Sequence, residues 1–257
     1  MTESKITLSA VEYLNTKPFI EGLKSFQIDS RVLITEDTPS QCSDKLKTGR
    51  ADIGIVPVAD FPNLIGFRKI TNWGIAANGP VDSVLLVGNQ PVERMAKIFL
   101  DYQSRTSNKL LRILNDEYFQ VHPDYELGYP GYEQGLEDGV GAVIIGDRAL
   151  KWGGLYRYRY DLAELWKKMT GLPFVFAIWV ASKRVDHELE RQIDKALGAA
   201  MHRKDEIAVH YQAQYAQIDL KHYFKHAIQY ALTEQYLEGM DLFLEKVQLL
   251  EEFIEEL

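Results

Sequence analysis

Residues 38–58 read TPSQCSDKLKTGRADIGIVPV, and this stretch decides the fold. Thr38 can accept a hydrogen bond at the start of a helix, and Gln41 follows three residues later, which is the pattern of a capping box. Gly49 then ends the helix. The mostly apolar run Ala51–Val58 is typical of a buried strand. The stretch therefore predicts a helix, a tight turn and a buried strand in immediate succession.

Runs of strand type continue on both sides of this stretch and alternate with helical patterns. Their alternation predicts an α/β fold with mostly parallel strands. From Asp186 onward the apolar residues recur at helical spacing, as Leu189, Ile193 and Leu197 show. The further strand candidates are Lys5–Ser9, Arg31–Thr35, Val84–Val87, Lys97–Leu100, Tyr125–Tyr129, Ala142–Gly146 and Phe174–Ala181.

The chain is organised as two lobes in this interpretation. Residues 79–83 (GPVDS) have the composition of a crossover into a second lobe, and the apolar strand Phe174–Ala181 returns from it. We expect the first lobe to be discontinuous and to include the C-terminal helices. The expected ranges are residues 1–82 and 180–257 for the first lobe and residues 83–179 for the second.

Charge and composition narrow the classes of partner. The chain has 257 residues, with 29 basic and 37 acidic side chains and a formal charge of −8. Such a balance argues against nucleic acid or an anionic membrane as the main partner, but it permits a small anionic ligand. A single cysteine, Cys42, excludes an intrachain disulfide. The opening residues show no leader pattern and no run is long enough to span a membrane, so we expect a cytoplasmic location.

The layout resembles a known fold at one characteristic spacing. Leu46, Gly49 and Asp52 lie at the helix end, the turn and the strand start, in the order L-x-x-G-x-x-D. This arrangement resembles the type II periplasmic-binding-protein fold, an α/β fold in which two lobes close over a ligand in the cleft between them. A plain helix–turn–strand connection has the same spacing, so this motif alone does not identify a family.

A narrower resemblance rests on several motifs in a fixed order. They are similar to those of the chorismate dehydratases of the menaquinone (futalosine) pathway. The sibling 1,4-dihydroxy-6-naphthoate synthases share the fold but open with an S-P-C-P-N-D-T-like run, which this chain replaces with Y-L-N-T-K-P. The motifs are Y-L-N-T-K-P at residues 13–18, I-V-P-V at 55–58, Ser83-Val84, S-x-T-S at 104–107, I-G-D at 145–147 and the segment 161–177.

The resemblance implies a reaction and leaves alternatives open. The implied enzyme is a carbon–oxygen lyase (a hydro-lyase) that converts chorismate to 3-[(1-carboxyvinyl)oxy]benzoate and water, with no cofactor and no metal. A cytoplasmic sensor or binding protein for a small carboxylate would have the same fold, because a fold does not determine function. The sibling naphthoate synthase is the other alternative. The sequence leaves the oligomeric state open.

Hydroxyl side chains offer anchors for a carboxylate. Ser104, Thr106 and Ser107 precede a predicted helix, where hydroxyls and unpaired backbone N–H groups favour an anion. Ordinary helix capping accounts for the same residues and is compatible with ligand binding. Ser83 at the crossover and Thr16 at another helix start are further candidates. The remaining candidates for substrate binding are Tyr13, Pro57, Gly146, which permits close approach of the backbone, and Asp147, whose charge equally suits helix capping.

A catalytic base is not evident in the sequence, because no histidine and aspartate stand at a meaningful spacing. The resemblance implies that the enolpyruvyl carboxylate of the substrate takes the proton, while Asn15 positions the ring and the departing hydroxyl. A neutral amide suits a dianionic substrate better than a carboxylate would. Asn15 is otherwise a simple turn residue. His222 and His226 stand four apart, but Tyr223 occupies the position of the glutamate in H-E-x-x-H, so no metal site is predicted.

Overall fold

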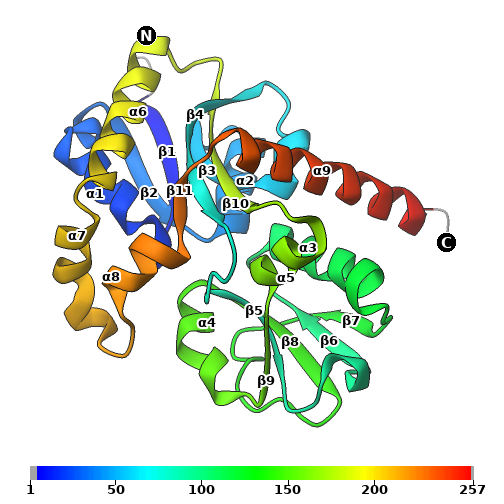
Figure 1. Cartoon of the computed structure of the whole chain (residues 1–257). Helices are drawn as coiled ribbons and strands as arrows, with labels where there is room; N and C mark the ends of the chain where they lie inside the picture. The colour runs from blue at the N-terminus through cyan, green and yellow to red at the C-terminus, as the bar shows by residue number, and fades with distance from the viewer. Residues whose placement is uncertain (1–4, 256–257) are drawn as a thin grey trace. The chain divides into compact units, whose positions relative to one another are not determined.

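The computed structural model describes residues 5–255, which form two compact units. The first unit contains the described residues up to Ala76 together with Phe176–Thr233. The second contains Ala77–Val175 and the C-terminal helix from Glu234 onward (Figure 1). None of the helices in the described part of the chain is long and apolar enough to cross a membrane.

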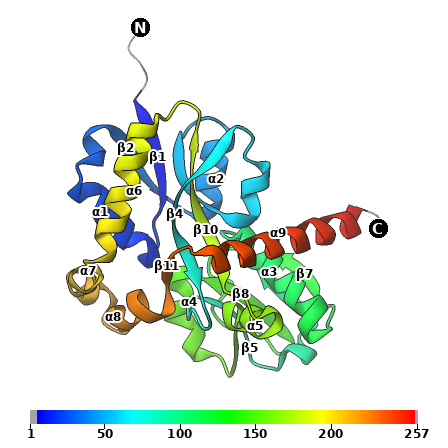
Figure 2. The same ribbon diagram turned by 45° about the horizontal axis from the view of Figure 1, so that its top comes forward.

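The first unit is built on a six-stranded sheet with the strand order β11-β4-β10-β3-β1-β2. Helices α1 and α6 lie side by side in both views (Figures 1 and 2). A Cβ atom on Gly22 of α1 would lie only 2.4 Å from the carbonyl oxygen of Ala196 in α6, so the close approach of the two helices depends on that glycine. The elements are β1 Ile6–Val11, α1 Lys17–Ser25, β2 Val32–Asp37, α2 Pro39–Lys47, β3 Ile53–Pro57, β4 Phe67–Ala77, β10 Phe174–Ser182, α6 His187–Met201, α7 Lys204–Tyr211, α8 Leu220–His222 and β11 Gln229–Ala231.

The second unit is built on a five-stranded sheet with the order β7-β6-β8-β5-β9. Helix α3 packs against both α5 and α9. The elements are β5 Val84–Gly88, β6 Lys97–Leu100, α3 Arg105–Leu114, the π-helical turn η5 Asn115–Phe119, β7 Asp124–Leu127, β8 Val140–Ile145, α4 Gly146–Trp152, β9 Tyr158–Asp161, α5 Leu162–Thr170 and α9 Glu234–Glu255.

The stretch that decides the fold forms the elements expected of it. Thr38 accepts a hydrogen bond from the backbone N–H of Gln41 at 3.4 Å, and the Gln41 side chain accepts one from the N–H of Thr38 at 2.9 Å, which completes the capping box. Gly49 adopts a left-handed φ of 68° after α2. Every residue of β3 is buried. The prediction of this helix, turn and strand is confirmed.

The expectation of mostly parallel strands is wrong. Strands β1, β2 and β3 pair in parallel, but β3 pairs antiparallel with β10. In the second unit β6 pairs in parallel with β7 and β8, whereas β5 pairs antiparallel with β8 and β9. Strand β11 likewise pairs antiparallel with β4, so both sheets are mixed.

The C-terminal helix is a second correction. We expected residues 180–257 to belong entirely to the first lobe, but α9 belongs to the second unit. Phe243 of α9 is fully buried and makes edge-to-face contacts with Phe174 and Trp166, at ring-centroid distances of 4.9 Å and 6.0 Å. Both partners belong to the second unit, because that unit extends to Val175 and so includes the first two residues of β10. Burial of this aromatic cluster fixes the helix on the second unit. Residues 1–4 and 256–257 of the expected ranges lie outside the described residues.

Candidate functional site

The start of α3 carries the three hydroxyl residues expected to hold a carboxylate. Ser104 is the N-cap, and its hydroxyl oxygen accepts a hydrogen bond from the backbone N–H of Ser107 at 3.1 Å. The Ser104 hydroxyl in turn donates to the Ser107 hydroxyl at 2.8 Å. Ser104, Thr106 and Ser107 are all buried. The capping interpretation is therefore correct for Ser104, whereas Thr106 and Ser107 lie within the first turn of α3. All three hydroxyls are at the positive end of a helix, where anions are stabilised.

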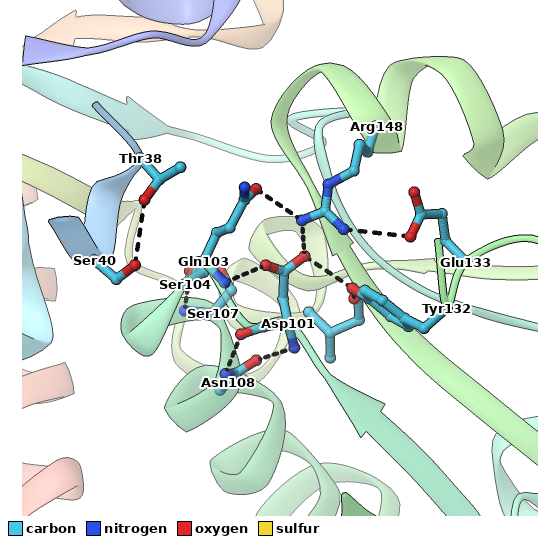
Figure 3. A network of polar contacts seen from close by, with 11 residues as sticks. Thr38, Ser40, Asp101, Gln103, Ser104, Ser107, Asn108, Tyr132, Glu133 and Arg148 are labelled. Atoms are coloured by element: carbon cyan, nitrogen blue, oxygen red, sulfur yellow. Dashed lines mark hydrogen bonds and ion pairs between the residues drawn. The ribbon is translucent and has the colours of Figure 1, made fainter. Parts of the chain in front are cut away.

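A buried carboxylate organises the loop that leads into this helix. One oxygen of Asp101 accepts a hydrogen bond from the backbone N–H of Gln103 at 2.8 Å, and the other lies 2.6 Å from a guanidinium nitrogen of Arg148 (Figure 3). The backbone N–H and carbonyl of Asp101 both bond to the side-chain amide of Asn108, at 2.9 Å and 2.8 Å. The loop is thereby fixed to the first turns of both α3 and α4.

Arg148 is enclosed by aromatic and acidic side chains of the second unit. Its guanidinium lies over the rings of Tyr102 and Tyr132, 4.9 Å and 5.6 Å from their centroids. It also contacts the buried Glu133 at 3.4 Å. The cation is thus held between two buried carboxylates, Asp101 and Glu133, on an aromatic support.

Proton placement around Asp101 is tightly constrained. The hydroxyl of Tyr132 lies 2.9 Å from the Asp101 carboxylate and also contacts the carbonyl oxygen of Val143. A tyrosine has one hydroxyl proton, so it satisfies only one of these acceptors at a time. Burial raises the pKa of Asp101, while Arg148 and the N–H of Gln103 oppose that rise. Burial likewise raises the pKa of Tyr132, which keeps its hydroxyl neutral.

Ser83 and Gly146 meet at the ends of two paired strands. The antiparallel register of β5 and β8 places Val84 opposite Ile145, and the N–H of Gly146 donates to the Ser83 carbonyl at 2.8 Å. Gly146 has a left-handed φ of 57° and begins α4, although we expected it to end a strand. Its N–H is therefore engaged by Ser83. Asp147 follows in the first turn of α4 and is half-buried.

Asp161 supports this corner, although it is not among the site residues predicted from the sequence. One of its oxygens accepts the backbone N–H groups of Val81 and Asp82, at 2.8 Å and 2.7 Å, just before Ser83. The other accepts the N–H groups of Ala163 and Glu164 at the start of α5, both at 3.1 Å. Burial raises the pKa of Asp161 to about 6, although the N–H groups of Glu164, Asp82 and Val81 act to lower it. Its position before an amphipathic helix was the signal available in the sequence.

The opening motif of the first unit holds Asn15 through hydrogen bonds from two hydroxyl groups. Asn15 lies in a short 3-10 turn, η1 Leu14–Thr16, and is half-buried. The Thr16 hydroxyl donates to the side-chain carbonyl of Asn15 at 3.1 Å, and the Tyr230 hydroxyl donates to its backbone carbonyl at 3.0 Å. The amide nitrogen of the Asn15 side chain makes no hydrogen bond among residues 5–255. It is therefore available as a donor to a ligand.

Tyr230 is another residue at this site that was not predicted from the sequence. Its side chain is buried, and its ring packs edge-to-face on Phe19, which in turn packs on Trp179, at centroid distances of 5.2 Å and 5.8 Å. Burial raises the pKa of Tyr230 well above its ordinary value, so the hydroxyl stays a neutral donor. No local pattern indicated this contact, since Tyr230 and Asn15 are 215 residues apart.

The candidate residues fall into two groups, and each group lies within one unit. Tyr13 and Thr16 are buried beside Asn15, and Pro57 is the buried last residue of β3. His222 and His226 lie with their ring centroids 5.2 Å apart, and the described residues contain no group of three or more possible ligands for a metal ion. The first unit contains Tyr13, Asn15, Thr16 and Pro57, and the second contains Ser83, Ser104, Thr106, Ser107, Gly146 and Asp147.

Solved structures define the class of fold. A protein from Archaeoglobus fulgidus superposes with a TM-score of 0.73 over 100% of both chains at 13% identity. A Candida albicans gene product, described as having the generic periplasmic-binding-protein fold, superposes with a TM-score of 0.62 at 8% identity, over 96% of this chain and 90% of the other. The expected fold, a two-lobed α/β fold of the periplasmic-binding-protein kind, is confirmed.

Sequence relatives identify the family within that class. A family model described as menaquinone biosynthesis matches residues 6–248, and the chain belongs to this family. A chorismate dehydratase of Campylobacter jejuni is 29% identical over 172 residues, 65% of this chain and 63% of the relative. One of Thermus thermophilus is 33% identical over 127 residues, 43% of this chain and 46% of the relative. The matches thus span between about half and two thirds of these relatives, and the resemblance seen in the motifs is confirmed.

Proposed function

We propose that the protein is a chorismate dehydratase, a hydro-lyase that converts chorismate to 3-[(1-carboxyvinyl)oxy]benzoate and water. Membership of the menaquinone biosynthesis family supports this assignment, as do two relatives that both carry the name chorismate dehydratase. The sibling naphthoate synthase and a sensor of the same fold have no comparable support.

The observation that carries the proposal is the buried set of hydroxyls at the start of α3. Chorismate bears two carboxylates, and a dianion needs donors that do not themselves carry negative charge. Because Ser104 donates its hydroxyl proton to Ser107, the hydroxyl proton of Ser107 can go to a further acceptor at the positive end of the helix, beside the buried Thr106. The Asp101–Arg148 ion pair fixes the loop that precedes them. We assign this helix start to one substrate carboxylate.

Asn15 supplies the second element of the proposal. Its side-chain carbonyl already accepts the Thr16 hydroxyl, which orients the amide so that its NH₂ group is left to donate. A donor of this kind stabilises the oxygen of the departing hydroxyl as the carbon–oxygen bond breaks. The amide carries no charge, so it does not repel the substrate. We assign Asn15 the role of positioning the ring and the leaving group.

The proton in this mechanism goes to the enolpyruvyl carboxylate of the substrate. The ring carbon beside the hydroxyl-bearing carbon loses its proton to that carboxylate, the carbon–oxygen bond breaks, and the departing hydroxide takes this same proton from the resulting carboxylic acid and leaves as water. The ring becomes aromatic, which drives the reaction. The main task of the protein is then to hold the substrate in the reactive geometry. Holding reacting groups in place in this way can accelerate a reaction strongly.

The direct test is the mass of the product. Purified full-length protein is incubated with chorismate, and the mixture is separated and analysed by mass spectrometry. The expected product is lighter than chorismate by one water and retains the enolpyruvyl group. Chorismate that binds but is recovered unchanged would favour the sensor, and chorismate that neither binds nor reacts would remove the proposed activity.

A further inference from the structure

A separate pocket of about 540 Å³ lies in the second unit. It is bounded by the end of α3, the π-helical turn η5, the segment that leads into β7 and the last turns of α9. None of the residues assigned above to chorismate lines it. Its apolar walls include Ile113, Val121, Leu249 and Leu250. Its polar lining consists of Arg112, Tyr125, His122, Lys246 and the carboxylates of Asp116 and Glu117.

The π-helical turn leaves a cation of this pocket without an acidic partner. In a regular α-helix Arg112 and Asp116 would be neighbours on one face. The wider turn begins at Asn115, and the carboxylate of Asp116 lies instead 3.9 Å from His122. Glu117, the next acid, pairs with Lys246 of α9 at 2.5 Å. The Arg112 guanidinium makes no hydrogen bond or ion pair within the described part of the chain.

An aromatic ring holds Arg112 in place. Its guanidinium carbon lies 4.7 Å from the centroid of the Tyr125 ring. The buried Asn115 donates from its side-chain amide to the Tyr125 hydroxyl at 2.9 Å, which fixes the ring. A guanidinium stacked in this way keeps its N–H donors in one plane, where they can meet a carboxylate with two parallel hydrogen bonds.

We propose that this pocket binds a small apolar carboxylate. The anion pairs with Arg112, and the apolar body of the ligand contacts Ile113, Leu249 and Leu250. The pocket volume lies within the range of small-molecule sites, which combine apolar walls with a few polar groups. In a chain with a formal charge of −8, an arginine without an acidic partner is a specific point of attraction for an anion. This inference is independent of the proposed dehydratase activity.

Methyl NMR on the full-length protein tests the proposal at the pocket itself. The methyl groups of isoleucine and leucine are labelled, and 3-phenylpropanoate is the probe. Saturable shifts are expected at Ile113, Leu249 and Leu250. The neutral analogue 3-phenylpropanamide should bind at least about tenfold more weakly, because it loses the charged hydrogen bonds to arginine.

Two variants separate the pocket from the general charge of the surface. Arg112→Gln should weaken probe binding by about tenfold or more. Arg157→Gln is the matched control, because Arg157 is exposed and its guanidinium carbon lies 5.5 Å from the centroid of the Tyr158 ring. This substitution should leave probe binding unchanged. Retained dispersion of the methyl spectrum shows that each variant is folded. Turnover of chorismate by Arg112→Gln should equal that of the wild type.

The proposal is overturned by any of three results. The first is the absence of shifts at the methyl groups of Ile113, Leu249 and Leu250 at about 10 mM probe, a concentration well above a millimolar dissociation constant. The second is equal binding of 3-phenylpropanoate and 3-phenylpropanamide. The third is equal binding of 3-phenylpropanoate by the wild type and by Arg112→Gln. Because the readout is binding at the pocket methyls, a failure of the dehydratase assay has no bearing on it.

Discussion

Thr16 and Ser104 occupy the same position in two helices, but their hydroxyl groups make different hydrogen bonds. Each is the N-cap residue of its helix, α1 in the first unit and α3 in the second. Ser104 caps α3 through a side-chain hydrogen bond with the backbone N–H of Ser107. Thr16 makes no such cap, and its hydroxyl donates to the side chain of Asn15. One hydroxyl closes a helix, and the other orients an amide.

The surroundings of Ser104 are charged, whereas the contacts that hold Asn15 beside Thr16 are made by neutral hydroxyl groups. The loop before Ser104 is held by charges, through the buried contact of Asp101 with Arg148. Asn15, beside Thr16, is held by the neutral hydroxyl of Tyr230, which packs on a buried aromatic cluster. The proposed function assigns substrate charge to the start of α3 and a neutral donor to Asn15. The following predictions test that division.

Removal of Arg148 should have the largest effect. Arg148→Met leaves the buried Asp101 without its cation, and breaking a buried ion pair in this way destabilises by about 3 kcal/mol near pH 8. Denaturant unfolding measures the change in the free energy of unfolding. Lys151→Met is the matched control, because it removes an exposed cation from the same helix, and it should change stability by less than about 0.5 kcal/mol. An equal loss in the two variants would contradict a special role for the Asp101–Arg148 pair.

Asn15→Ala should affect chemistry with little effect on folding. Loss of one well-placed donor to a developing negative charge typically lowers kcat by about 100-fold, or about 2.7 kcal/mol in activation free energy. Steady-state turnover of chorismate measures it. Asn15→Asp should be equally impaired, because it places a negative charge beside a dianion. A variant with full kcat in either case would show that Asn15 is only a turn residue.

The fold was largely predictable because its strongest signals are local. The capping box at Thr38 and the apolar strand that follows Gly49 are set by neighbouring residues, and the structure reproduces both. Strand direction and the placement of α9 depend on contacts between distant segments. Phe243 selects the second unit by packing on Phe174 and Trp166, and no periodicity within the last helix reveals which surface it will cover.

The candidate site was predictable only where a motif marks it. Ser104 and Ser107 were recognisable as a helix start, and their bonding confirms the cap. Asp101, Arg148 and Tyr230 were missed because their roles arise from partners that lie 47 and 215 residues away along the chain. Such contacts follow from sheet topology, which a single sequence specifies only weakly.

Ser104→Ala should have a smaller effect, divided between stability and binding. Loss of an N-cap hydroxyl destabilises by about 1 kcal/mol, and loss of the group that orients the Ser107 hydroxyl toward the substrate carboxylate should raise KM by up to about tenfold. Asp186→Ala is the matched control, because Asp186 caps α6 by accepting the N–H of Leu189 at 2.7 Å. It should show a similar loss of stability with an unchanged KM. Equal KM values in both variants would reduce Ser104 to a helix cap.

The smallest expected effect is a slope in stability with pH that depends on Asp101. Burial raises the pKa of this carboxyl above its unfolded value of about 3.9, so the folded protein holds the proton more tightly than the unfolded chain. The stabilising contribution of the proton is complete below the unfolded pKa and is lost as pH rises through the folded one. Urea unfolding between about pH 4 and 8 should therefore show wild-type stability falling relative to Asp101→Asn, which has no proton to lose. A difference between the two proteins that stays constant over this range, or that grows in favour of the wild type, would mean that Arg148 and the Gln103 N–H outweigh burial and keep Asp101 ionised throughout.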